Sequence, residues 1–178
     1  MAMGRGRMHR LGAMALILAW LSAAPAAAAG LDMARDLAAD ARLMRERGVV
    51  MLVLFSQDGC PWCERARKEV LLPLQAAPGA ARRVLLREIA LDADTPLVDF
   101  AGRRSSHRRF AAAAQARITP TLVVYGPDGE RLGEAIVGFR LPDFYAEYVE
   151  RAIDEGLARL RAPAGAELSP AQRQRTPP

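Results

Sequence analysis

The strongest constraint on the fold of this chain is an apolar run that ends just before its only two cysteines. Residues 49–55 read VVMLVLF, which is too short for an ordinary helix and is typical of a strand buried on both faces. A turn-rich stretch leads from this run to Cys60 and Cys63, and apolar residues then recur at helical spacing over residues 61–75. We therefore expect both cysteines at the point where a buried strand gives way to a helix.

A second strand completes a β-α-β unit. Pro78 and Gly79 end the helix, and residues 84–91 read VLLREIAL, which predicts a strand. Two strands joined in this way run parallel, with a right-handed crossover. Upstream of the unit, apolar residues recur at helical spacing over residues 31–47 and predict an amphipathic helix that ends at Gly48.

The second half of the chain predicts an antiparallel pair of strands and a final helix. A Pro-Asp-Gly turn at residues 127–129 separates two apolar segments, which favours a hairpin, and Gly138 follows the second segment. The predicted elements are a loop at 95–104, a helix capped by Ser105 or Ser106 that runs to about Arg117, strands at 121–125 and 132–137, and an amphipathic helix at 141–160.

Residues 1–29 have the features of a secretory signal peptide. Three arginines precede an apolar stretch at residues 11–24, and an Ala-x-Ala site predicts cleavage after Ala29. The alternative is an uncleaved membrane anchor, but the apolar stretch is shorter than the roughly 20 residues that a spanning helix needs. The Ala- and Arg-rich composition is typical of a high-GC bacterium, so we expect the protein in the periplasm.

Downstream of the signal peptide, one domain is expected at residues 30–161. Residues 162–178 are rich in Pro, Ala, Gln and Arg without apolar periodicity and predict a disordered tail. The net charge of +5 includes the three signal arginines; without them, 22 basic residues stand against 20 acidic ones. The remaining charge of +2 gives no reason to expect nucleic-acid binding.

A basic cluster lies near the middle of the chain. Its members are Arg103, Arg104, His107, Arg108 and Arg109. Charge runs of this kind usually form a solvated face, so we expect His107 at the surface and not as a catalytic base. Steering of an acidic partner is the alternative.

The two cysteines predict a redox couple. At a helix start, Cys60 faces unpaired backbone N–H groups and the positive end of the helix dipole, which favour its thiolate, so Cys60 is the expected nucleophile. Cys63 lies one turn further on and can resolve the mixed disulfide. Pro61 suits the first helical turn. Trp62 either contacts substrate or packs locally, and the residues leave both readings open.

Other uses of a Cys-x-x-Cys pair fit less well. A disulfide that closes so small a loop adds little stability, and a structural zinc ion needs four ligands, for which only His107 remains downstream of the signal peptide. Covalent haem requires a histidine where Glu64 stands. A non-enzymatic Cu(I)-binding module stays as an alternative from a different class, because two thiolates suit copper. We expect no cofactor and no metal.

The chain resembles the thioredoxin family over roughly residues 31–160. The resemblance rests on the buried strand, Cys60-Pro61-Trp62-Cys63 at a helix start, the second parallel strand, Ile118-Thr119-Pro120, the Pro-Asp-Gly hairpin and Gly138. It implies an α/β thioredoxin-like fold with a central mixed β-sheet of four to five strands flanked by helices. It also implies a cis Pro120 beside the redox pair and substrate pairing along the backbone of Thr119. Exported bacterial thioredoxin-like proteins, including those that accompany sulfur oxidation, look most similar.

Two departures from the family pattern concern the redox pair. Pro61 and Trp62 stand where typical thioredoxins have Gly-Pro, and Leu54 stands where they have a buried aspartate. The proton acceptor for Cys63 is therefore not in its usual place. Asp58 and Glu64 are close in sequence, but charges at exposed ends are more often simply solvated.

These features predict a periplasmic thiol:disulfide oxidoreductase that mainly reduces disulfides of client proteins. A periplasmic reductase needs an electron donor, for which we expect a membrane thiol carrier, and we expect the protein to be a monomer. Oxidase or isomerase activity is the nearer alternative, because each 30 mV shifts the two-electron equilibrium by about 1.4 kcal/mol and small changes reverse the favoured direction.

Overall fold

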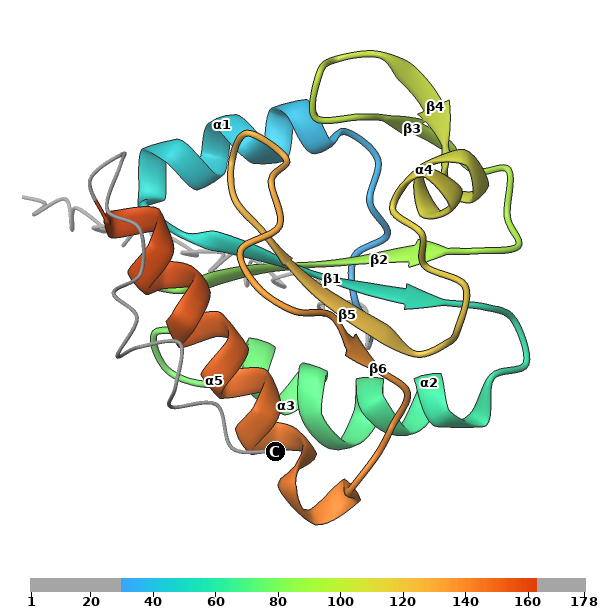
Figure 1. Cartoon of the computed structure of the whole chain (residues 1–178), viewed down its shortest axis with the longest axis vertical. Helices are drawn as coiled ribbons and strands as arrows, with labels where there is room; N and C mark the ends of the chain where they lie inside the picture. The colour runs from blue at the N-terminus through green and yellow to red at the C-terminus, as the bar shows by residue number, and fades with distance from the viewer. Residues whose placement is uncertain (1–29, 163–178) are drawn as a thin grey trace, which may run out of the picture.

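The apolar run at residues 49–55 lies at the centre of a four-stranded sheet. The computed structural model describes residues 30–162 (Figure 1). The run forms β1 (Val50–Ser56), which is buried along its whole length. β1 pairs in parallel with β2 (Val84–Ala90) and antiparallel with β5 (Thr121–Tyr125), and β5 pairs antiparallel with β6 (Ile136–Val137). The order β2-β1-β5-β6 is the mixed sheet of four to five strands that the sequence predicts.

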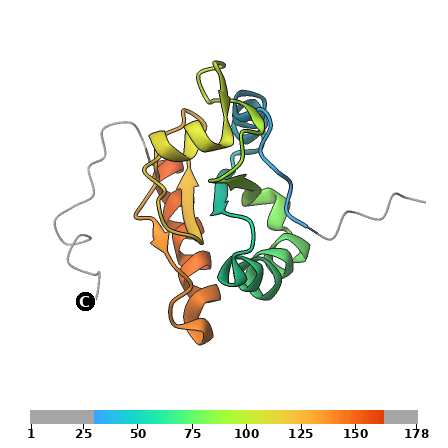
Figure 2. The same ribbon diagram turned by 90° about the vertical axis from the view of Figure 1, so that its right-hand side faces the viewer.

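Helices cover both faces of the sheet, as Figure 2 shows. One face packs on α1 (Leu37–Arg47) and α4 (His107–Ala113). The other packs on α2 (Pro61–Arg65), α3 (Leu72–Ala76) and the long α5 (Pro142–Arg161). Alternate residues of the buried strands therefore enter two separate apolar cores.

The predicted helix at residues 61–75 is present but changes its winding. α2 continues into a π-helical segment, η1 (Ala66–Leu71), and then into α3, and a short 3₁₀ turn, η2 (Ala80–Arg82), follows. The amide of Leu72 donates to the carbonyl of Arg67 five residues earlier, at the residue before Pro73. Proline has no N–H to donate, which accounts for irregular winding at this point.

The prediction of a helix from residue 31 was wrong for its first six residues. α1 begins at Leu37, and the side chain of Asp36 caps it by accepting a hydrogen bond from the amide of Ala39 at 2.7 Å. Residues 31–36 are extended instead, and this segment exchanges backbone hydrogen bonds with Glu88 of β2. The capping aspartate explains the difference, because it stabilises a helix start at its own position.

The predicted loop at residues 95–104 was also wrong in part. β3 (Pro96–Val98) and β4 (Arg104–Ser106) form a small antiparallel pair of their own. Ser106 caps α4, as expected, but α4 ends at Ala113, before a left-handed Gln115, and not near Arg117.

The predicted surface position of His107 was wrong. The side chain is fully buried; its Nδ1 accepts from the amide of Ala90 at 3.1 Å, and its Nε2 lies 2.7 Å from the carbonyl oxygen of Ala34. His107 is the first residue of α4, where the helix turns it inward, while Arg108 and Arg109 stay exposed. It holds the extended segment and the end of β2 together.

The C-terminal half agrees with the sequence except in the length of one strand. α5 matches the helix predicted at 141–160, but the strand predicted at 132–137 forms only as the two residues of β6. The proposed signal peptide at 1–29 lies outside the described residues, as does the proposed tail apart from Ala162. Among the helices of residues 30–162, none combines the length and apolar character needed to cross a membrane.

Candidate redox site

Cys60 and Cys63 form a disulfide at the start of α2. β1 ends at Ser56, and an exposed loop carries the chain to Cys60, which takes the N-cap position. The Sγ of Cys60 accepts a hydrogen bond from the amide of Cys63 at 3.1 Å. Cys60 is 9% exposed and Cys63 only 1%, so Cys60 is the sulfur that a partner reaches more easily. This agrees with the order of attack predicted from the sequence, and the roles themselves stay predictions.

Trp62 packs locally, which was one of the two readings that the sequence left open, and its contact with substrate stays a prediction. Half of its surface is exposed, while its ring stacks on Phe139 with centroids 6.1 Å apart. The guanidinium of Arg65 lies over both rings, and Phe139 also packs at a tilt against the buried Tyr145, with ring centroids 4.4 Å apart. Phe139 and Arg65 thus fix the position of the Trp62 ring, and part of the ring remains accessible to solvent beside the cysteines.

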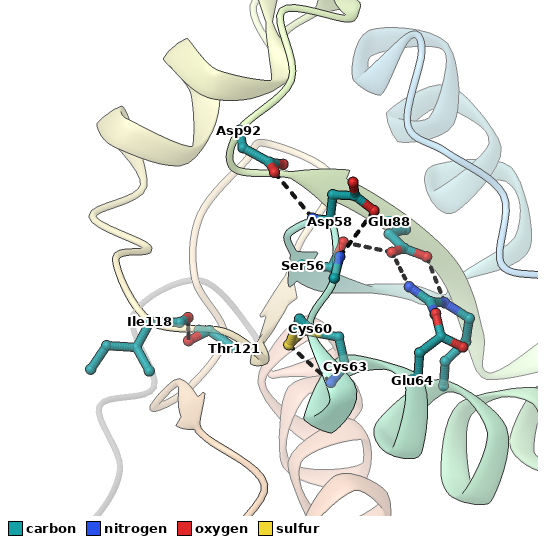
Figure 3. Close-up of a disulfide and its surroundings, with 11 residues drawn as sticks. Ser56, Asp58, Cys60, Cys63, Glu64, Glu88, Asp92, Ile118 and Thr121 are labelled. Carbon is teal, nitrogen blue, oxygen red and sulfur yellow. Dashed lines mark hydrogen bonds and ion pairs between the residues drawn. A yellow bond between two sulfur atoms is a disulfide. The ribbon is translucent and has the colours of Figure 1, made fainter.

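Thr119 and Pro120 lie at the start of β5, next to the end of β1. The peptide bond between them is cis, as the resemblance implies. Thr121, the next residue, pairs with Phe55 of β1, and the hydroxyl of Thr121 donates to the carbonyl of Ile118 at 2.7 Å. Figure 3 shows Ile118 and Thr121 on one side of the disulfide. The sequence segments expected to form the site therefore come together, while substrate pairing by Thr119 stays a prediction.

An open cleft of about 790 Å³ lies on the other side of Cys60. Its walls include Ser56, Arg67 and four acidic residues. These acidic residues are Asp58, Glu64, Glu88 and Asp92. Cys60 itself belongs to the wall, so the sulfur that is predicted to attack borders on a strongly charged space.

The sequence reasoning missed a buried ion pair in this cleft. Glu88 of β2 is only 5% exposed, and its Oε2 accepts from the Nε of Arg67 at 3.0 Å. The hydroxyl of Ser56 donates to Oε1 at 2.6 Å (Figure 3). A second guanidinium nitrogen of Arg67 donates to the same oxygen. The available signal was an Arg-Glu doublet inside the otherwise apolar strand at residues 84–91.

Glu64 and Asp58, the acids close to the motif in sequence, have different surroundings. Glu64 is exposed but bonds to Arg67, and this hydrogen bond and the positive charge hold the pKa of Glu64 below its ordinary value. Arg67 in turn has a raised pKa, chiefly because of its hydrogen bond to Glu88. Asp58 is exposed, and its backbone amide donates to Asp92 at 3.1 Å. Arg67 therefore links the redox helix to two carboxylates.

Within residues 30–162, no three side chains of the histidine, cysteine, aspartate and glutamate types gather as a metal site would require. Cu(I) binding by the two cysteines alone stays an alternative.

The sequence matches the family described as "Thioredoxin-like domain" over residues 37–153. No curated protein matches the chain. Similar solved structures include the periplasmic thioredoxin SoxS from Paracoccus pantotrophus, at 23% identity and a TM-score of 0.42, covering 60% of this chain and 97% of that one. Mitochondrial thioredoxin 3 from Saccharomyces cerevisiae is 19% identical, with a TM-score of 0.45 and coverage of 70% and 94%. A Thermus thermophilus thioredoxin is 20% identical, with a TM-score of 0.45 and coverage of 70% and 85%.

Proposed function

The chain belongs to the family of thioredoxin-like domains, and from this premise we propose that it reduces disulfides of client proteins in the bacterial periplasm. The fold and the Cys-x-x-Cys pair are those of a thiol:disulfide oxidoreductase. The observation that carries the proposal is the disulfide at the helix start, with the more exposed sulfur beside an open cleft.

The reaction needs only the two sulfurs of the protein and those of the client. The thiolate of Cys60 attacks the client disulfide, a Cys60–client disulfide forms, and the first client sulfur leaves and takes up a proton. Cys63 then attacks Cys60, the Cys60–Cys63 disulfide forms, and the second client sulfur leaves and is protonated. Two electrons have moved from the protein to the client; the thiol of Cys63 supplies one of the two protons, and solvent supplies the other because Cys60 attacks as a thiolate.

The proposed location rests on residues 1–29. Their basic start, apolar stretch and Ala-x-Ala site support export by a cleaved signal peptide. Because the periplasm is kept oxidising, a reductase there must be reduced again after each cycle, and we propose a membrane thiol carrier as the donor. Sequencing the N-terminus of the protein recovered from a periplasmic extract tests this; we expect it to begin at Gly30, and recovery only with membranes, with residues 1–29 retained, contradicts cleavage.

Insulin reduction by the purified protein with dithiothreitol tests the activity. The wild-type protein should precipitate insulin chains, and Cys60→Ser should abolish this. An absence of activity that depends on Cys60, together with tight stoichiometric copper binding, would support the metal-binding alternative instead.

Trapping with Cys63→Ser tests the client-directed role. This variant leaves the mixed disulfide unresolved, so periplasmic client proteins should accumulate as covalent adducts of Cys60. The matched control is the double variant with Cys60→Ser, which can form no adduct at that position. If Cys63→Ser accumulates no more adducts than the control, the client-directed role is wrong.

A further inference from the structure

The reaction just described does not use Glu88, although this carboxylate lies in the same cleft as the attacking sulfur. Glu88, its partner Arg67 and Ser56 all line the cleft with Cys60. Ser56 comes four residues before Cys60, and Arg67 comes seven residues after it on the helix that the cysteines begin. Figure 3 shows Ser56 between Glu88 and the disulfide.

Glu88 is held in place through both of its carboxylate oxygens. Both of its oxygens accept from Arg67, and Oε1 also accepts from Ser56. A bidentate guanidinium pair of this kind is the strongest form of carboxylate binding among side chains. The side chains of Arg67 and Glu88 are 15% and 7% exposed, so water screens their charges less than it screens surface charges.

These charges act differently on the two redox states. The disulfide carries no charge, whereas the reduced protein carries a thiolate at Cys60 once the pH permits. A negative charge at Glu88 disfavours that thiolate and a positive charge at Arg67 favours it. Stabilising the reduced form makes a dithiol–disulfide couple more oxidising, and destabilising it makes the couple more reducing.

We propose that the Arg67–Glu88 pair sets the reduction potential of the Cys60/Cys63 couple, with Glu88 making the couple more reducing and Arg67 opposing it. The inference rests on the redox couple of the proposed function and names what regulates its direction. Glu88 and Arg67 act through the thiolate and touch no reacting atom, so they are positioning residues and not catalytic ones.

Other charged groups face the same space. Asp58 lies on the loop before Cys60, Glu64 on α2 and Asp92 after β2, and all three are acidic. Glu64 is bonded to Arg67 and is also 3.4 Å from the ammonium of Lys68. Glu88→Gln leaves the contacts of these three groups in place, whereas Arg67→Gln also removes the ion pair of Glu64, so the Glu88 variant reports on the pair most directly.

Equilibration with glutathione tests the inference. The protein disulfide and two glutathione thiols exchange with one protein thiolate, one protein thiol, one glutathione disulfide and one proton. Glu88→Gln should move the equilibrium at least about threefold toward the reduced protein, and Arg67→Gln should move it toward the disulfide; a tenfold change corresponds to about 30 mV. The ultraviolet absorbance of the thiolate should appear at lower pH in Glu88→Gln and at higher pH in Arg67→Gln.

A matched pair on the opposite face of β2 provides the control. Arg87 donates to Asp40 of α1 from two nitrogens, at 2.8 and 2.6 Å, and their side chains are 16% and 12% exposed. Asp40→Asn removes a similarly buried carboxylate from a bidentate pair that does not line the cleft. It should lower thermal stability while the glutathione equilibrium stays at the wild-type value. Thermal unfolding of each variant shows that it is folded before its equilibrium is measured.

The outcomes separate the two proposals. If the wild-type protein does not equilibrate with glutathione as a two-electron couple, the proposed function fails. If it does, but Glu88→Gln and Arg67→Gln shift it in the same direction, or Asp40→Asn shifts it as much as Glu88→Gln, the inference alone is overturned. Shifts of opposite sign, with no shift for Asp40→Asn, support it, because a merely structural role would not reverse sign between partners.

Discussion

Two buried ion pairs occupy consecutive residues of β2 and face opposite sides of the sheet. Glu88 accepts from Arg67 on the side of the redox helix, and Arg87 donates to Asp40 on the side of α1. Both pairs are bidentate and similarly buried, but only one shares a cleft with Cys60. The comparison separates what a buried ion pair contributes to folding from what its position contributes to chemistry.

The largest difference between the Glu88 side and the Asp40 side of the sheet should be in disulfide-reducing activity. Cys60→Ser should lower insulin reduction about a hundredfold or more, because it removes the nucleophile. Asp40→Asn, on the other side of the sheet, should retain activity at temperatures where it stays folded. Insulin turbidity with dithiothreitol measures both. A folded Asp40→Asn protein as inactive as Cys60→Ser would contradict the assignment of chemistry to one side.

The two ion pairs should contribute about equally to the free energy of unfolding. Arg67→Met and Arg87→Met each leave a buried carboxylate without its guanidinium, so each should lower the free energy of unfolding by about 3 kcal/mol. Urea unfolding of the oxidised proteins measures this. A loss confined to one of the two variants would show that the pairs are not equivalent structurally.

His107 should add to the stability of the Asp40 side alone. His107→Leu leaves the amide of Ala90 and the carbonyl of Ala34 without their partner in a buried place, which should cost about 2 kcal/mol. The same unfolding measurement applies, with Arg109→Leu on the exposed face of α4 as its control. Equal losses in the two variants would mean that the buried hydrogen bonds of His107 contribute nothing.

Substitution of Tyr145, on the Glu88 side of the sheet, should have the smallest effect on stability. Burial raises its pKa to about 12, and within residues 30–162 its hydroxyl has no hydrogen-bond partner. Because the folded state holds this proton more tightly than the unfolded state, Tyr145 should contribute stability below pH 10.0 that is lost as the pH rises toward 12.

Tyr145→Phe should therefore change stability at neutral pH by less than about 1 kcal/mol and should unfold less readily than the wild type above pH 10.0. Thermal unfolding across this range measures the difference, with Tyr148→Phe on the exposed side of α5 as the control. Identical alkaline curves for Tyr145→Phe and the wild type would contradict the role assigned to the buried hydroxyl.

Local patterns predicted the elements that position the redox pair. The apolar run of β1, the helix after Cys60 and the Pro-Asp-Gly turn each depend on residues close in sequence, and each was found as expected. The extended segment before α1 was not predicted, because its structure depends on backbone bonds to Glu88, more than fifty residues away.

The acidic residue that is buried beside the redox pair could not be predicted by looking for acids close to the cysteines in sequence. Leu54 stands where the family has a buried aspartate, and the acids near the motif, Asp58 and Glu64, proved exposed. The buried acid is Glu88, and the register of the parallel strands places it opposite Leu54. His107 was misplaced for a similar reason, since its arginine neighbours suggested a surface position and only the start of α4 turns it inward.

The most direct test of this account is the reduction potential of the wild-type Cys60/Cys63 couple, measured in glutathione buffers. The account predicts a single two-electron transition on the reducing side of about −200 mV, which suits a donor of electrons to client disulfides. The absence of a two-electron transition, or a potential near about −120 mV as in a strong periplasmic oxidant, would contradict it.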